Sequence, residues 1–274
     1  NVPGGAAIGN ALHEVLERID FAAPDPRRIR EEVATSLLLH GVDAPAGEVA
    51  DALVRGLGTP LPRIPGDAAG RPGLRLRDIR AADRLSEMAF DFPVAGGLDA
   101  GAGPGTVTPA DVAAVFEEHP DGQTPAGYAA HLARLRFGAF RGYLNGKVDL
   151  VFRVRRPDLP EAGRYYVVDY KSNRLGDRLS DYAPARLADE VADAHYVLQY
   201  HLYLVALHRL LAWRLGGAYD YDAHVGGAYY LFLRGLGGES ATADTGVFRH
   251  RPSRARIEAL SALFDAGGRP RGAT

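Results

Sequence analysis

The sequence contains no cysteine. Disulfides, thiolate zinc sites and iron–sulfur clusters are excluded together, because each of them needs cysteine sulfur. A chain without cysteine also fits a reducing compartment, so we expect a cytoplasmic protein.

An excess of positive charge is absent as well. The 32 basic and 34 acidic residues give a formal net charge of −2. Dedicated nucleic-acid-binding domains are often strongly basic, so the bulk charge gives no support to DNA binding. Any contact with nucleic acid must come from a local patch or from bound metal ions.

Long hydrophobic runs and nucleotide-binding loops are also absent. No apolar run reaches the roughly 18–20 residues that span a bilayer, so we expect no membrane partner. The N-terminus, NVPGGAAIGNALHEV, lacks the basic segment and apolar core of a signal peptide. It does not begin with Met, which suggests an excised domain. No G-x-x-x-x-G-K-[ST] segment occurs, so a helicase activity is not expected of this chain.

The 274 residues, 46% of them hydrophobic, suffice for one large domain with a sizeable core. Apolar residues at helical spacing predict helices over 6–20, 26–40 and 46–57. We expect one α/β domain over 1–274, with a mainly helical region at 1–85 and a mixed α/β core at 86–274.

The second part of the sequence alternates strand and helix patterns. Residues 86–94 alternate between apolar and polar, as in a half-buried strand. Asn145-Gly146 predicts a hairpin turn between strands 138–144 and 147–154. Further strands are predicted at 164–171 and 227–234. Helices are predicted to start at Thr108 and Thr124, the latter running to Arg136, to extend over 185–215 with a break near Ala194, and to cover 253–265.

The strongest chemical pattern is formed by Asp149, Asp169 and Lys171. Asp169 and Lys171 are two residues apart on a predicted strand, so their side chains share a face. Asp149 lies on the preceding strand, and pairing of the strands would bring two carboxylates together. Such carboxylates repel each other unless a cation such as Mg²⁺ lies between them. From spacing alone, however, an Asp and a Lys on one strand are more often a solvated polar face.

The other candidates are weaker when judged by pattern. His13 lies beside the apolar stripe of the first helix, where a single histidine is usually structural. Glu87 is an acidic residue on a strand, usually at the surface. Gln199 and Tyr203 are spaced i and i+4 on a helix, which usually makes a local side-chain pair.

Four segments change this assessment, because they resemble segments of the nuclease domain of the RecB family. They also occur in the same order as in that family. They are GYLNGKVDLVFR (142–153), YYVVDYKSNRLGD (165–177), YVLQYHLYLVALHRLL (196–211) and GGAYYLFLRG (226–235). ALHEVLERIDF (11–21) also resembles the family's first helix. The family is a branch of the PD-(D/E)XK nucleases, so the resemblance implies a mixed sheet flanked by helices.

The resemblance also implies roles for individual residues. His13, Asp149 and Asp169 would hold Mg²⁺, and Lys171 would be the catalytic lysine. Glu87 would lie near the site, and Tyr170 occupies the position between the catalytic Asp and Lys, where the superfamily name has an acidic residue. A further match is the Q-x-x-x-Y motif at Gln199 and Tyr203, expected near DNA.

The activity implied is Mg²⁺-dependent hydrolysis of DNA in a RecBCD-type helicase–nuclease, leaving 5′-phosphate and 3′-hydroxyl ends. The partners implied are single-stranded DNA ends from unwound duplex, RecC-like and RecD-like subunits, and RecA. Two alternatives remain. One is a nuclease-like interaction module that docks RecA or a partner subunit without cutting DNA. The other is a nuclease of a different branch, although the branches that hold an iron–sulfur cluster need cysteines that this chain lacks.

Overall fold

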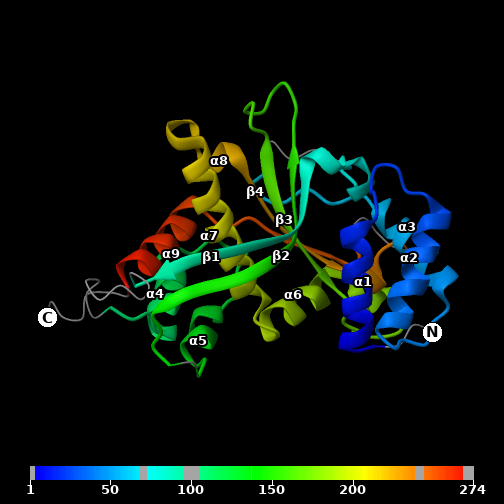
Figure 1. Ribbon diagram of the computed structural model, residues 1–274. Helices are drawn as coiled ribbons and strands as arrows, with labels where there is room; N and C mark the ends of the chain where they lie inside the picture. The colour runs from blue at the N-terminus through cyan, green and yellow to red at the C-terminus, as the bar shows by residue number, and fades with distance from the viewer. Residues whose placement is uncertain (1–3, 68–72, 96–104, 137, 238–243, 268–274) are drawn as a thin grey trace, which may run out of the picture. The chain divides into compact units, whose positions relative to one another are not determined.

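The computed structural model describes residues 4–67, 73–95, 105–136, 138–237 and 244–267. Within these ranges, a five-stranded sheet has the order β1-β2-β3-β4-β5. Figure 1 labels β1 to β4 and most of the helices. The strands are β1 Arg84–Val94, β2 Gly142–Val154, β3 Arg164–Lys171, β4 Val225–Phe232 and β5 Val247–His250. The helices are α1 Ala6–Arg18, α2 Pro26–Leu39, α3 Ala46–Leu57, α4 Pro109–Glu118, α5 Tyr128–Ala133, α6 Pro184–Asp193, α7 Tyr196–Leu215, α8 Tyr221–His224 and α9 Arg254–Ala266. The expected mixed sheet flanked by helices is confirmed.

The chain folds as two compact units. The first unit comprises Asn1–Met88, Val148–Val191 and Gly226–Arg251, and the second comprises Ala89–Lys147, Ala192–Val225 and Pro252–Thr274. The division at 85/86 that the sequence suggests stays a prediction. Within the parts of the chain that the structure describes, no helix is both long and apolar enough to cross a membrane.

Most predicted elements are present, and their caps explain where they begin. Thr108 accepts a hydrogen bond from the Asp111 N–H, and Ser253 accepts one from the Arg256 N–H. These side chains satisfy backbone donors that have no partner within the first turn of a helix. The predicted break near Ala194 separates α6 from α7.

Two predictions are wrong. Asn145 and Gly146 do not form a turn but lie inside the continuous strand β2. A tight turn of the predicted kind needs positive φ at both residues, and neither has one. The helix predicted from Thr124 to Arg136 is reduced to α5, because Gly127 adopts φ 79, which a helix cannot accommodate. Most of the predicted loop at 95–107 lies outside the described residues.

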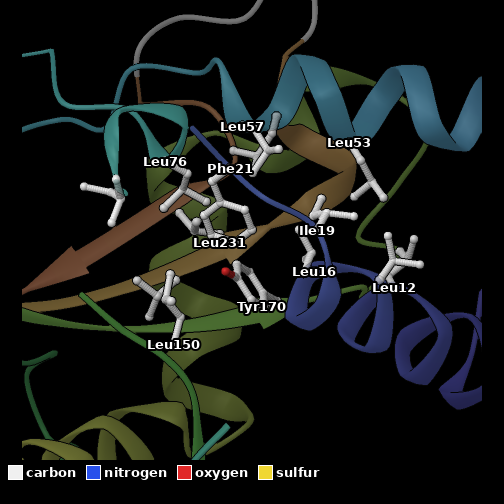
Figure 2. Close-up of a cluster of buried hydrophobic side chains, with 14 of the residues drawn as sticks. Leu12, Leu16, Ile19, Phe21, Leu53, Leu57, Leu76, Leu150, Tyr170 and Leu231 are labelled. Atoms are coloured by element: carbon white, nitrogen blue, oxygen red, sulfur yellow. The ribbon is translucent and has the colours of Figure 1, made fainter. Parts of the chain in front are cut away.

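The core of the first unit fixes the orientation of β3. Side chains on one face of β2, β3 and β4, such as Leu150, Tyr170 and Leu231, meet Leu16 of α1 and Leu57 of α3 (Figure 2). Because successive side chains of a strand point to opposite faces, the neighbours of Tyr170 in β3 face away from this core. Burial of the apolar face therefore determines the direction of the polar one.

Candidate metal centre and active site

Asp169 and Lys171 form an ion pair on one face of β3. Lys171 Nζ lies 2.7 Å from Asp169 Oδ1, and both side chains are largely buried. The Lys171 ammonium also lies 5.0 Å from the centre of the Tyr230 ring on β4. The two side chains thus share a face, as their spacing predicts.

Asp149 enters the site from β2. The antiparallel pairing of β2 and β3 runs from Val154↔Arg164 to Leu150↔Val168, and one step further along the same ladder stand Asp149 and Asp169. Burial raises the pKa of Asp169 to about 6, and the charge of Asp149 adds to the rise, against the opposing effects of Lys171 and His13. The site therefore concentrates negative charge at a buried point, as an ion-binding site does.

Tyr170, between Asp169 and Lys171, contributes its main chain. Its N–H donates a hydrogen bond to Asp149 Oδ2 at 2.7 Å, and its carbonyl oxygen accepts one from His13 Nε2 at 2.9 Å. The phenol ring points into the core, where burial raises its pKa well above the ordinary value. One peptide segment therefore orients two candidate ligands.

His13 reaches the site from α1. Its Nδ1 lies 3.4 Å from Asp149 Oδ1. Burial lowers the pKa of His13, but the hydrogen bond with Asp149 and the charges of Asp149 and Asp169 outweigh it, so that the pKa is raised. A positive charge at this position, whether a proton or a metal ion, is therefore favoured by the surrounding carboxylates.

Glu87 on β1 completes the cluster. One ligand atom from each of His13, Glu87 and Asp149 lies within 4.8 Å of the others. Glu87 has φ 51, a left-handed conformation that non-glycine residues rarely adopt. Such strain persists where the surroundings hold it, and it is frequent at functional sites. Asp169 stands outside this set of three, with its Oδ1 against Lys171.

Gln199 and Tyr203 lie on α7 in the second unit. Gln199 Nε2 donates a hydrogen bond to the Tyr203 hydroxyl at 2.7 Å, and the Tyr203 ring meets the edge of Phe90 on β1 at a centroid distance of 6.0 Å. The structure thus gathers His13, Glu87, Asp149, Asp169, Tyr170 and Lys171 in the first unit, whereas the described contacts of this pair lie in the second.

Arg234 and Asn173 hold the backbone just after Lys171, and the sequence patterns do not single out either residue. Arg234 Nε donates to the Ser172 carbonyl at 2.9 Å. Asn173 Nδ2 donates to Glu190 Oε1 of α6 at 2.8 Å. The segment 226–235 contains Arg234, but no sequence pattern shows which carbonyl an arginine contacts.

Comparisons with known proteins show the family of the chain. The chain matches the model of the PD-(D/E)XK nuclease superfamily over residues 3–266. It is 40% identical over 278 residues to RecBCD enzyme subunit RecB of Mycobacterium tuberculosis, which covers 97% of this chain and 24% of that protein. It is 33% identical to the subunit of the same name from Escherichia coli K12, covering 96% of this chain and 19% of that protein. The chain thus spans a quarter or less of the length of these relatives, and it belongs to the PD-(D/E)XK nuclease superfamily.

Proposed function

We propose that this chain is a Mg²⁺-dependent deoxyribonuclease domain. It would be the nuclease module of a RecBCD-type helicase–nuclease that degrades DNA and acts in double-strand break repair. The observation that carries the proposal is the convergence of His13, Glu87 and Asp149 next to the Asp169–Lys171 ion pair. The similarity to part of the RecB subunits supports a module within a larger enzyme.

The donor set fits a hard divalent cation. Carboxylate oxygens are the preferred ligands of Mg²⁺, and one imidazole is compatible with Mn²⁺ as well. His13, Asp149 and Asp169 would hold the ion, and Glu87 would complete the set. Burial, and then the charge of Asp149, raise the pKa of Asp169. This supports the assignment, because a cation between the carboxylates would offset both the cost of burying the charge and the repulsion. A bound Mg²⁺ would polarise the scissile phosphate and lower the pKa of a water molecule.

The residues of the chain would supply the remaining chemistry. Asp169 pairs with the Lys171 ammonium. In the proposed reaction this ammonium would donate a hydrogen bond to the attacking water or to the phosphate oxygen on which negative charge develops. The main chain of Tyr170 keeps the carboxylate of Asp149 and the ring of His13 in fixed orientations. In-line attack of water on the phosphorus would break the P–O3′ bond, and protonation of the departing 3′-oxygen would leave a 5′-phosphate and a 3′-hydroxyl.

Two variants separate metal binding from chemistry. Asp169→Ala removes a proposed ligand, so it should abolish cleavage of single-stranded DNA and weaken Mn²⁺ binding measured by calorimetry. Lys171→Gln should abolish cleavage but retain Mn²⁺ binding, because an ammonium group cannot be a ligand. Cleavage that survives in either variant, or that continues in excess chelator, would show that the proposed site is wrong.

The partners that we propose follow from the same similarity. The substrate would be single-stranded DNA produced by unwinding, and RecC-like and RecD-like subunits would surround the module. RecA is a further partner proposed from the resemblance. Pull-down of each purified partner by the 274-residue chain tests these contacts one by one, and a chain that captures none of them would remove this part of the proposal.

A further inference from the structure

Helix α1 and the end of β3 approach each other at two points. The first is the hydrogen bond from His13 Nε2 to the Tyr170 carbonyl at 2.9 Å. At the second, Gly9 lies so close to Ser172 that a Cβ at Gly9 would be 2.8 Å from Ser172 Oγ. Four residues advance a helix by about 6 Å, and two residues advance a strand by about 6.6 Å. The distance from Gly9 to His13 along α1 therefore matches the distance from Ser172 to Tyr170 along the strand direction.

We propose that Gly9 is a positioning residue for the metal centre. Its lack of a side chain allows α1 to lie against Ser172, and this approach places His13, one turn further along the same helix face, beside Tyr170 and Asp149. The inference rests on the proposed function, in which His13 is a metal ligand. Helix formation does not explain the residue, because glycine is among the least favourable residues in a helix interior.

The backbone on the Ser172 side of the contact is held in place by other elements. The Ser172 carbonyl accepts a hydrogen bond from Arg234, and the next side chain, Asn173, is bonded to Glu190. Ser172 is therefore part of a backbone segment held by elements other than α1. A methyl group at position 9 must rotate the Ser172 side chain or displace α1.

Displacement of α1 would act directly on His13. Ser36 Oγ donates to the Ala11 carbonyl at 3.1 Å, and Leu12 and Leu16 are buried in the core of the first unit. These contacts hold α1 against the core. A methyl group at Gly9 would therefore tilt the adjacent turn, which carries His13, rather than shift the whole helix. Changes in residues that orient a metal ligand commonly reduce metal affinity by roughly 10–100-fold. We therefore expect Gly9→Ala to weaken Mn²⁺ binding by about tenfold.

The test measures Mn²⁺ affinity by calorimetry, without DNA, on variants of the 274-residue chain. Gly47→Ala is the matched control, because Gly47 lies in α3, is exposed, and a Cβ there would meet nothing within 4 Å. Ser172→Ala removes the Oγ and leaves a Cβ at 3.8 Å, an ordinary contact distance. We expect Gly9→Ala to lose about tenfold in affinity, and the double variant Gly9→Ala/Ser172→Ala to return to within about twofold of the parent, as Gly47→Ala does.

The outcomes separate this inference from the proposed function. If His13→Ala binds Mn²⁺ as the parent does, the proposed ligand set is wrong. If His13→Ala loses affinity but Gly9→Ala does not, only the positioning role is overturned. If Gly9→Ala alone fails to fold, the double variant still decides: recovery of folding and affinity supports the contact as the cause, and failure to recover overturns the inference.

Discussion

The main-chain N–H of Tyr170 donates a hydrogen bond to Oδ2 of Asp149, 21 residues earlier in the chain, at 2.7 Å. This bond joins β2 to β3 at the point where the carboxylates of Asp149 and Asp169 come together. The carbonyl of the same residue binds His13. The backbone of Tyr170 therefore holds two of the candidate ligands, and its ring meets the His13 ring edge-on at a centroid distance of 5.8 Å, with the hydroxyl pointing into the core.

Tyr170→Phe should consequently leave nuclease activity and Mn²⁺ affinity within about twofold of the parent. Among the described residues, the buried Tyr170 hydroxyl has no hydrogen-bond partner, so its removal should not lower the free energy of unfolding. Single-turnover cleavage and urea unfolding of the two proteins measure both quantities. A large loss of cleavage at unchanged stability would show that the hydroxyl takes part in the reaction.

Asp169→Asn should stabilise the chain when no divalent ion is present, and only at neutral or alkaline pH. The pKa of Asp169 is raised from 3.8 to about 6 by burial and by the charge of Asp149. A carboxyl group whose pKa is raised by folding stabilises the folded state while it is protonated. This contribution is fully present below about pH 4 and is lost as the pH rises through about 6. The parent should therefore be less stable than Asp169→Asn at pH 8, by roughly 1–3 kcal/mol, and nearly equal to it at pH 4.

Urea unfolding in chelator at the two pH values measures this difference. Saturating Mg²⁺ should restore stability to the parent at pH 8 and much less to the variant, because binding stabilises the folded state. A stability difference that is the same at pH 4 and pH 8 would contradict the account of Asp169.

Glu87 should show a trade between stability and ion binding. Its φ of 51 costs a non-glycine residue roughly 1 kcal/mol or more. Both Glu87→Ala and Glu87→Gly should weaken Mn²⁺ binding, because both remove the carboxylate. Glu87→Gly also relieves the backbone strain, so it should be about 1 kcal/mol more stable than Glu87→Ala. Equal stability of the two variants would show that the left-handed backbone is not strained.

The isolated domain should bind single-stranded DNA weakly, with a dissociation constant on the order of 10⁻⁵ M or higher at physiological salt. Five arginines lie near the proposed site in the sequence and are candidates for phosphate contacts: Arg141, Arg153, Arg155, Arg156 and Arg174. In the structure, Arg153 and Arg155 pair with Asp83 at 2.8 and 2.6 Å, Arg156 pairs with Asp158, and Arg174 pairs with Asp177. Phosphates must therefore compete with carboxylates for these four side chains.

A helicase that feeds the strand past the site would make intrinsic affinity unnecessary, since tethering gives an effective concentration of roughly millimolar. Fusion of the domain to an unrelated single-strand-binding module should therefore increase cleavage. The salt dependence of binding and the cleavage rate of the fusion are the two measurements. Nanomolar binding by the domain alone, or no gain on fusion, contradicts this prediction.

The local part of the site could be predicted from the sequence because strand geometry determines it. Asp169 and Lys171 share a face since they are two residues apart, and the alternation around them is regular. The close approach of Asp149 follows from the pairing of consecutive strands. The resemblance, and not the spacing, is what selects His13 and Glu87.

The features of the fold and of the candidate site that could not be predicted depend on contacts between segments that are distant in the sequence. The sequence predicts Gly146 in a turn, but a Cβ at this position would lie 2.7 Å from the Phe90 ring of β1, so the glycine leaves room for that ring. The contact between Gly9 and Ser172 is of the same kind. A sequence shows a glycine but not the neighbour that requires it.

The most direct test of the metal centre is an anomalous difference map from a crystal of the 274-residue chain soaked in Mn²⁺. We expect one strong peak at roughly 2.0–2.3 Å from an imidazole nitrogen of His13 and a carboxylate oxygen of Asp149, with Asp169 or Glu87 as a further ligand. A peak that lies away from His13 and Asp149 in a chain saturated with Mn²⁺ would show that these residues do not form the metal centre.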